Sequence, residues 1–288
     1  MLKVLQIFRQ DNEERINKVK AGIDFILSHF EGRQQLFPRK ISTAFSNGRQ
    51  FSVYGREQIL EECIKSNFID CRINAYPVLN ESTIHHQTPN IIFIDLDLSK
   101  DLPYQVALNQ LEKTKNKSLK IIKEKLNGCR PTILWTGNGY HIYIVLDIRP
   151  LELIKELKEL SAIPSEEFLK YAEIAFSNKK KDHAHIPTFK SSLLRIPYTF
   201  NSKNQQQVKI IQEFDKENIP SIDPEFLRGF RLWLVDNDIR NKQEIIKNHN
   251  KNSLKSNRHN KAMRNYFWIE KLLQTPIPCF IIIAYIVF

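Results

Sequence analysis

The sequence predicts a mixed α/β protein of the α+β type, in which short strands and helices share one core. Two long segments carry apolar residues at helical spacing, one near the N-terminus and one between residues 105 and 127. Residues 140–148 instead alternate between two faces with the period of a strand. A third apolar run, residues 90–97, has the length of a strand and ends in two aspartates. Together these patterns predict both helices and strands in the same chain.

The expected elements follow one another without an internal repeat. They are helices at 1–30, 56–67, 105–127, 150–160 and 165–178, and strands at 51–54, 71–77, 90–97, 131–135, 140–148, 193–198 and 208–214. Gly32 and Gly128 each follow a long helix and are expected to end it. Thr136-Gly-Asn-Gly139 is a tight turn of the hairpin type between two strands. Residues 37–45 break the helical pattern and are assigned to no element.

The length of the chain limits how many domains it can form, and its charge indicates the class of its partner. A chain of 288 residues suits a main domain with a smaller annex. We expect a core at 1–222, followed at 223–288 by a basic linker and a partial helical C-terminal domain. No acidic residue occurs between Glu244 and Glu270, where lysines and arginines recur. The net charge of +11 favours a polyanionic partner, either nucleic acid or a membrane surface.

The cysteines and the apolar tail indicate the cellular environment in which the protein works. The four cysteines form no C-x-x-C pair, which argues against a structural zinc site or a disulfide framework. We therefore expect no zinc, a reducing interior and a cytoplasmic location. The tail at 277–288 is almost wholly apolar but shorter than the roughly 20 residues that a membrane helix needs. We expect no membrane partner, and an apolar surface there that another protein could cover.

The strand at 90–97 places two carboxylates on one face. Because side chains alternate along a strand, Asp95 and Asp97 share one face, opposite Ile92 and Ile94. Two carboxylates at the end of an apolar run are costly unless a positive charge holds them. Mg²⁺, bound by carboxylates together with phosphates, fits such a pair best. The alternative is that the two aspartates only cap the following turn.

A glycine turn leads into the second candidate group. Gly137 and Gly139 would let backbone N–H groups approach an anion closely. His141 is expected on the strand face opposite Ile142 and on the same side as Tyr143. There it can donate a hydrogen bond to a phosphate oxygen. The alternative is a simple hairpin turn with a half-buried histidine.

The third candidate group lies between Ser191 and Lys203. Arg195 is on a strand that Pro197 ends, and Lys203 follows in a polar loop. An arginine offers a planar fork to phosphate, and a lysine offers a point charge. Asp182 precedes this segment, after three lysines. The alternatives are a solvated strand edge and, for Asp182, a solvated loop aspartate.

In this order, the three groups resemble the motifs of the archaeo-eukaryotic primase superfamily, which includes the primase-polymerases of archaeal mobile elements. Phe93-Ile-Asp-Leu-Asp97 is similar to its metal motif, and Thr136-Gly-Asn-Gly-Tyr-His141 to its nucleotide-binding motif. Asp182 matches by position the acidic residue of the third motif. Leu194-Arg-Ile-Pro-Tyr-Thr-Phe-Asn-Ser-Lys203 is similar to an Arg-x-Pro-x-Thr-x-Asn-x-Lys element of many members, with Tyr198 where a glycine is common. The resemblance covers roughly residues 35–215.

The resemblance implies both a fold and a function. The fold would be a primase catalytic core, with an RRM-like antiparallel sheet packed on an α/β module and a short helical C-terminal segment. The function would be that of a DNA primase or primase-polymerase. Such an enzyme transfers a nucleotide from an NTP or dNTP to a 3′-hydroxyl, directed by a single-stranded DNA template. A helicase or another replisome subunit is a candidate partner.

The resemblance also implies roles for individual residues. The catalytic residues would be Asp95, Asp97 and Asp182, which would bind two Mg²⁺ or Mn²⁺ ions. Nucleotide binding would fall to Thr136, Gly137, Gly139, His141, Arg195 and Lys203. The template backbone would be contacted by Arg39 and Lys40, through salt-sensitive and sequence-independent interactions.

Two other functions share parts of this pattern. A non-catalytic nucleic-acid-binding subunit could keep the fold without needing the carboxylates, the histidine and the Arg and Lys pair. A metal-dependent nuclease would need the carboxylates but no clamp for a triphosphate. The presence of all these groups in one chain favours nucleotidyl transfer.

Overall fold

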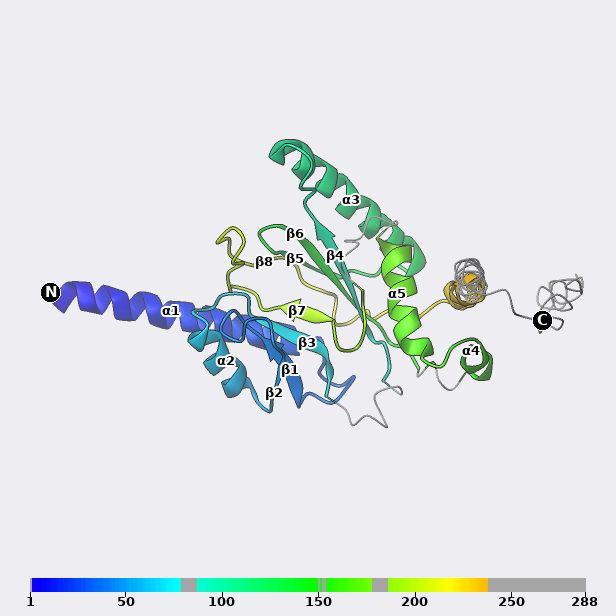
Figure 1. Cartoon of the computed structure of the whole chain (residues 1–288), viewed down its shortest axis with the longest axis horizontal. Helices are drawn as coiled ribbons and strands as arrows, with labels where there is room; N and C mark the ends of the chain where they lie inside the picture. Colours follow the sequence, from blue (N-terminus) through cyan, green and yellow to red (C-terminus); the bar gives the residue numbers. More distant parts are fainter. Residues whose placement is uncertain (1, 79–86, 150, 152–153, 178–185, 238–288) are drawn as a thin grey trace, which may run out of the picture. The chain divides into compact units, whose positions relative to one another are not determined.

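The computed structural model describes residues 2–78, 87–149, 151, 154–177 and 186–237, with side chains from residue 12 onward (Figure 1). The chain divides into compact units at 1–236 and 237–288, and the described residues belong to the first unit apart from residue 237. Most of the predicted linker and helical annex therefore lies outside the described residues, and the predicted boundary after residue 222 stays a prediction. No helix in the described part combines the length and apolar character needed to cross a membrane.

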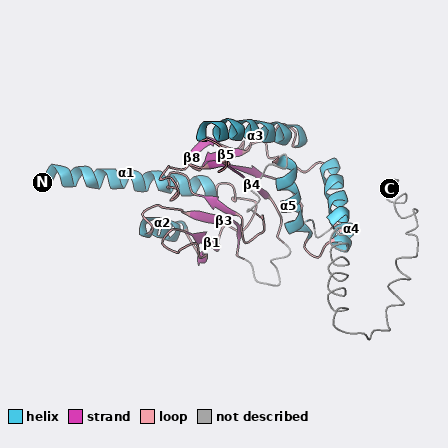
Figure 2. Cartoon of the chain, turned by 45° about the horizontal axis from the view of Figure 1, so that its top comes forward, coloured by secondary structure: helices cyan, strands magenta, loops and turns pink. Residues whose placement is uncertain are grey.

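Antiparallel sheets and the helices packed on them make up the described fold, which confirms the predicted α/β class (Figure 2). The elements are α1 (Leu2–Leu27), β1 (Arg39–Ser42), β2 (Phe51–Val53), α2 (Arg56–Lys65), β3 (Arg72–Pro77), β4 (Ile91–Asp97), α3 (Tyr104–Lys125), β5 (Thr132–Trp135), β6 (Gly139–Val145), α4 (Lys155–Leu160), α5 (Pro164–Phe176), β7 (Leu193–Arg195) and β8 (Lys209–Gln212). Helical backbone also spans 224–237.

The first sheet has the strand order β2-β1-β3-β7 and is antiparallel throughout. β1 lies in the stretch to which the sequence assigned no element, because four mixed polar and apolar residues are too few to show a period. β7 comes from far downstream, and its Arg195 pairs with Arg72 of β3. The predicted strand at 193–198 is shorter in the structure, because Pro197 lacks an N–H donor and Tyr198 adopts a φ of 66°. A positive φ at this position is the backbone conformation that glycine adopts most readily.

The second sheet has the order β4-β6-β5-β8. β4, α3, β5 and β6 follow one another in the chain, and β6 inserts antiparallel between β4 and β5. The β4–β6 register places Asp95 opposite His141 and Asp97 opposite Gly139. The predicted hairpin between β5 and β6 is confirmed.

Two apolar clusters pack on opposite faces of β4. One cluster contains Ile92 and Ile94 and extends to side chains of α3 and α5. The other contains Phe93 and Tyr143 and extends to α1, α2 and the first sheet. The alternation predicted for this strand is therefore confirmed, and Asp95 follows Phe93 onto the face that looks toward the first sheet.

Arg39 is a structural residue of the core, so its predicted contact with a template is wrong. Its side chain is fully buried, and its guanidinium lies 3.5 Å from the centre of the Phe30 ring. It donates hydrogen bonds to the backbone carbonyls of Leu36, Asn74 and Gln35. Burial lowers the pKa of Arg39 to about 9, so the side chain stays charged at neutral pH. Lys40 is partly exposed, and its template contact stays a prediction.

His29 joins the end of α1 to the second sheet. Its Nδ1 lies 2.9 Å from the carbonyl oxygen of Phe25, and its Nε2 lies 2.7 Å from Oγ1 of Thr132. Because a carbonyl only accepts, Nδ1 carries the hydrogen and Nε2 accepts from the threonine hydroxyl. Burial lowers the pKa of His29 to about 4, which keeps the imidazole neutral in the folded protein near pH 7.

We predict that acidification from pH 7 to pH 5 destabilises the protein through His29. An unfolded histidine, with a pKa near 6.5, takes up a proton in this range, whereas folded His29, with a pKa of about 4, does not. The contribution is fully present above pH 6.5 and is lost as the pH falls toward 4, by about 2 kcal/mol at pH 5. Urea unfolding of the wild type and of His29→Gln at both pH values measures it. The same pH dependence in both proteins would contradict the assignment.

Candidate active site

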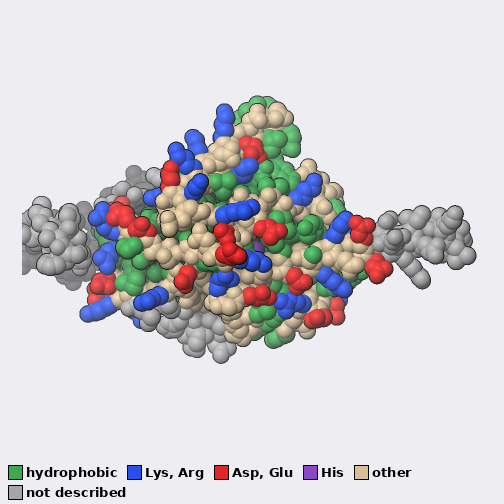
Figure 3. Space-filling view, turned by 180° about the vertical axis from the view of Figure 1, so that it is seen from behind, with side chains coloured by type: hydrophobic (Ala, Val, Ile, Leu, Met, Phe, Trp, Pro, Cys, Tyr) green, Lys and Arg blue, Asp and Glu red, His purple; other side chains and the backbone are tan. Residues whose placement is uncertain are grey.

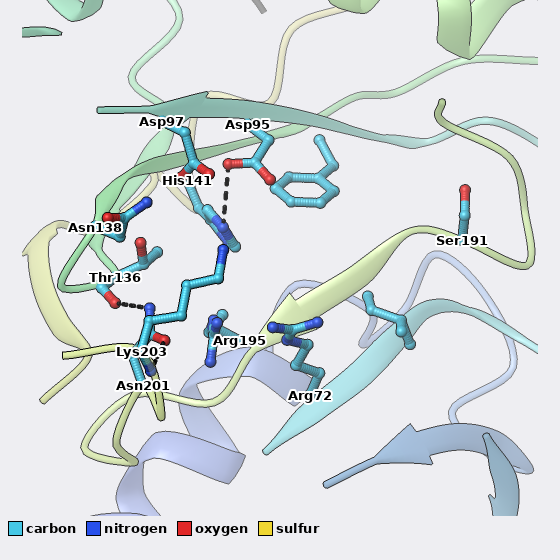
Figure 4. Close-up of a pocket in the computed structure, with 12 residues that line it drawn as sticks. Arg72, Asp95, Asp97, Thr136, Asn138, His141, Ser191, Arg195, Asn201 and Lys203 are labelled. Carbon is cyan, nitrogen blue, oxygen red and sulfur yellow. Dashed lines mark hydrogen bonds and ion pairs between the residues drawn. The ribbon is translucent and has the colours of Figure 1, made fainter. Parts of the chain in front are cut away.

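One pocket brings together most of the predicted site residues (Figure 4). It is lined by Arg72, Phe93, Asp95, Asp97, Thr136, Asn138, His141, Ser191, Leu193, Arg195, Asn201 and Lys203. The two carboxylates project from β4 on one side, and the two guanidinium groups lie on β3 and β7 on the other (Figure 4). Acidic and cationic side chains thus face each other across a single hollow between the two sheets.

The third predicted carboxylate cannot be placed in this pocket, since Asp182 lies outside the described residues. Its role stays a prediction. Among the residues that the structure describes, no three His, Cys, Asp or Glu side chains gather in a way that could hold a metal ion. The described part of the pocket therefore supplies Asp95 and Asp97 as its carboxylates.

Asp95 and His141 lie side by side at the centre of the pocket. Oδ1 of Asp95 is 3.4 Å from Nε2 of His141, and both side chains are largely buried. The ring of Phe93 packs against the imidazole, with ring centres 4.7 Å apart. His141 is on the same face as Tyr143, as the strand pattern predicted.

The hydroxyl of Tyr143 fixes the orientation of His141. It accepts a hydrogen bond from the backbone N–H of Arg195 at 3.0 Å, and it lies 3.0 Å from Nδ1 of His141. Burial raises the pKa of Tyr143, so the phenol keeps its hydrogen. A phenol that accepts from the amide of Arg195 can donate its own hydrogen to Nδ1 of His141. A hydrogen on the imidazole is then carried by Nε2, which faces Asp95 and the pocket.

The glycine turn has two distinct geometric requirements. Gly137 adopts a φ of 87°, a conformation that other residues rarely take. Gly139 pairs with Asp97, and a Cβ added there would collide with the carbonyl oxygen of Leu96 and lie 2.8 Å from Oδ1 of Asp97. The second glycine thus allows β6 to approach the end of β4 that carries the carboxylates.

The same turn is tied to the polar loop that follows β7. Nδ2 of Asn201 donates to the carbonyl of Thr136 at 2.9 Å, and Nδ2 of Asn204 donates to the carbonyl of Gly137. These bonds bring the loop with Lys203 to the edge of the pocket, where Figure 4 shows its side chain directed toward His141. The glycine turn and the loop after β7, predicted as separate groups, therefore lie side by side along one edge of the pocket.

Arg195 and Arg72 form the cationic floor of the pocket. Arg195 is almost completely buried, and its Nη1 lies 2.7 Å from Oδ1 of Asp70. Arg72 is its direct strand partner, and burial, followed by the nearby charge of Arg195, lowers the pKa of Arg72. Two neighbouring guanidinium groups repel each other, and an anion bound between them relieves that repulsion. This arrangement suits a phosphate-bearing ligand.

Arg72 and Asn138 were missed by the sequence analysis. Arg72 lies in a predicted strand but in no motif, and its place beside Arg195 depends on the pairing of β3 with β7. Asn138 lies between Gly137 and Gly139, and an asparagine in a tight turn is common enough to give no sign of a site. The polar pattern of the loop after β7 included Asn201, but not its bond to the turn.

The face shown in Figure 3 carries no large patch of charge of one sign. Lys and Arg side chains are interspersed there with Asp and Glu. The strong net charge of the chain therefore does not by itself locate a template path on that face.

Comparison with known proteins finds likeness at the level of structure only. No protein-family model matches the sequence, and no curated protein matches it. The chain is similar to the crystal structure of the catalytic domain of primase RepB′ in complex with initiator DNA, with a TM-score of 0.44 and 12% identity over 79% of this chain and 98% of that one. It is also similar to the crystal structure of primase RepB′, with a TM-score of 0.43 and 11% identity over 82% of this chain and 68% of that one. At these scores the likeness is a coarse one, and the function proposed below rests on the site itself.

We predict that Gly139→Ala lowers the free energy of unfolding by about 1–3 kcal/mol, because the new methyl group overpacks the junction of β6 with β4. Urea denaturation measures the change. Gly55→Ser is the control, since Gly55 has an ordinary φ of −166°, its added Cβ would meet only the side chain of Glu57 at 3.4 Å, and serine suits its N-cap position on α2. Equal stability of the two variants would contradict the close approach at Gly139.

Proposed function

We propose that the protein is a DNA primase or primase-polymerase, which transfers a nucleotide from an NTP or dNTP to a 3′-hydroxyl under the direction of single-stranded DNA. The observation that carries the proposal is the pocket in which Asp95 and Asp97 face Arg195 and Lys203, with His141 between them. The motif resemblance in the sequence independently names the same residues.

Two Mg²⁺ or Mn²⁺ ions would complete this site, held by Asp95, Asp97 and Asp182. The described pocket supplies carboxylate oxygens and no thiol, and that donor set fits a hard divalent cation. Bound there, such ions reduce the negative charge of a triphosphate and activate the attacking 3′-hydroxyl.

The cationic side chains would bind the triphosphate of the incoming nucleotide. Arg195 and Arg72 offer planar forks to the phosphate oxygens, and Lys203 offers a point charge from the loop after β7. His141 would donate from Nε2 to a phosphate oxygen. Together these groups would hold the phosphates in line with the hydroxyl and stabilise the charge of the transition state.

Three cations opposite the carboxylates favour this function over a nuclease. A phosphodiester carries one negative charge where it is cleaved, whereas a triphosphate carries several that need cationic partners. The pocket presents Arg72, Arg195 and Lys203 together with the two aspartates. A subunit that only binds nucleic acid would not need two carboxylates in the same pocket, where they repel a phosphate backbone.

The test is an incubation of the protein with single-stranded DNA, labelled nucleotides and Mn²⁺. New oligomers on a denaturing gel support the proposal, and parallel reactions with ribo- and deoxynucleotides identify the substrate. Shortening of the template would instead identify a nuclease. Template binding without any product would leave a non-catalytic binding protein.

We predict that Asp95→Ala lowers the rate of synthesis by at least about a hundredfold, because it removes a carboxylate needed for the metal ions. Template binding, measured by fluorescence anisotropy, should change less than about threefold. Asp101→Asn is the matched control, since it removes an exposed carboxylate just beyond the end of β4 and should leave both quantities unchanged. Equal losses of synthesis and binding would show a structural role for Asp95.

We predict that Arg195→Lys raises the KM for nucleotide by about tenfold while kcat falls less. Lysine keeps the charge but loses the planar fork that meets two phosphate oxygens at once. Steady-state kinetics with varied nucleotide measure the split. Arg228→Lys is the control, because that arginine is exposed and pairs only with Glu225 of its own helix among the described residues. A wild-type KM in Arg195→Lys rules out the phosphate contact.

A further inference from the structure

Asp70 stands directly behind the cationic floor of the pocket without lining it. Its Oδ1 accepts a hydrogen bond from Nη1 of Arg195 at 2.7 Å and one from the backbone N–H of Ser202 at 3.3 Å. Nη2 of Arg72 is 4.0 Å from the same oxygen. One carboxylate oxygen therefore lies next to both guanidinium groups and to the loop that carries Lys203.

The backbone around Asp70 is held in an unusual conformation. Asn67, Phe68 and Asp70 adopt φ values of 52°, 62° and 53°, in the left-handed region that residues other than glycine rarely occupy. Such conformations persist where the surrounding structure determines them, and they concentrate at functional sites. Here the surrounding structure is the C-terminal end of α2, where the N–H of Phe68 donates to the carbonyl of Cys63 at 2.7 Å, together with the loop after β7.

That loop is fastened to the 68–70 segment by main-chain hydrogen bonds. The N–H of Asp70 donates to the carbonyl of Phe200 at 2.8 Å, and the N–H of Phe200 donates to the carbonyl of Phe68 at 2.8 Å. The side chain of Asp70 extends this pairing by one further contact, to Ser202. Asp70 thus bonds to Arg195 at the end of β7 and to Ser202 in the loop that carries Lys203.

The ionisation of Asp70 suits this position. Partial burial raises its pKa, but hydrogen bonds from Ser202 and Arg195 outweigh that effect and leave the pKa below its ordinary value. The carboxylate is therefore charged at neutral pH.

We propose that Asp70 is a positioning residue for triphosphate binding, which fixes the guanidinium fork of Arg195 and the Lys203 loop in the geometry that receives the phosphates. This inference rests on the function proposed above and adds a residue that lies outside every motif of the sequence. Asp70 touches no substrate in this arrangement, and it acts through Arg195 and Ser202.

If only its negative charge mattered, Asp70 would weaken phosphate binding rather than support it. A carboxylate behind the pocket repels a polyanion, so its removal should strengthen phosphate binding if charge were its whole contribution. If Asp70 positions the cations, its removal should weaken phosphate binding, because a free arginine side chain loses conformational order and the fork no longer points into the pocket. The sign of the change therefore separates the two roles.

Two variants isolate the carboxylate from the backbone. Asp70→Asn keeps a side-chain oxygen that can accept from Arg195 and Ser202, and asparagine tolerates a positive φ. Asp70→Gly removes the side chain while accepting the same φ without strain. Asp24→Asn is the matched control, since it breaks another aspartate–arginine pair, at 3.0 Å from Arg56, on an exposed surface outside the pocket.

In the synthesis assay, we expect the KM for nucleotide to rise about tenfold or more in Asp70→Gly, and less in Asp70→Asn. The value of kcat should stay within about threefold, and Asp24→Asn should match the wild type. Unchanged or lower KM values in both Asp70 variants would overturn the inference. Thermal unfolding of each variant identifies any general loss of structure, which would lower kcat and template binding as well.

Binding of inorganic tripolyphosphate, measured by calorimetry, tests the same role without requiring synthesis. We expect Asp70→Gly to bind it about tenfold more weakly than the wild type. If the wild type makes no product but this loss of affinity is seen, the proposed function fails and the role of Asp70 stands. If the wild type binds no tripolyphosphate, or Asp70→Gly binds it equally or more tightly, the role of Asp70 is overturned.

Discussion

The antiparallel pairing of β4 with β6 is the constraint on which the rest of the site depends. Its register sets Asp95 against His141 and Asp97 against Gly139, and it turns the alternate side chains of β4 into the helix-covered core. A slip by one residue would exchange the two faces, burying the carboxylates under α3 and α5. Because that exchange would place charges in an apolar core, the register is strongly specified, and the position of the acids follows from hydrophobic burial.

The cationic side of the pocket has a different origin. Arg72 and Arg195 belong to the other sheet, and they meet because β7 adds to β3. The hydroxyl of Tyr143 connects the two systems, since it accepts a hydrogen bond from the backbone N–H of Arg195 and lies 3.0 Å from Nδ1 of His141. The two guanidinium groups repel each other, and the carboxylate of Asp70 offsets part of that repulsion from behind the pocket.

Much of the fold and of the described site could be predicted from the sequence, because the decisive signals are local. The apolar alternation of β4 fixed the face of Asp95, and the two glycines marked the turn before His141. What could not be predicted depends on contacts between distant segments: the short strand β1, the approach of Arg72 to Arg195, and the anchoring of the loop by Asp70. Arg39 was misjudged because a cation in a polar stretch gives no sign of the carbonyl groups that surround it.

The division of the pocket between two sheets has a consequence for which ligands the protein can bind. Each sheet has its own strand pairing, and each brings charges of mainly one sign to the shared hollow. Neither half alone offers a binding place for a ligand that needs both signs. Such a ligand is therefore bound only where the two sheets pack together, and the apolar cluster that holds Phe93 and Tyr143 beside Ile41 and Ile73 sets the distance between the opposite charges.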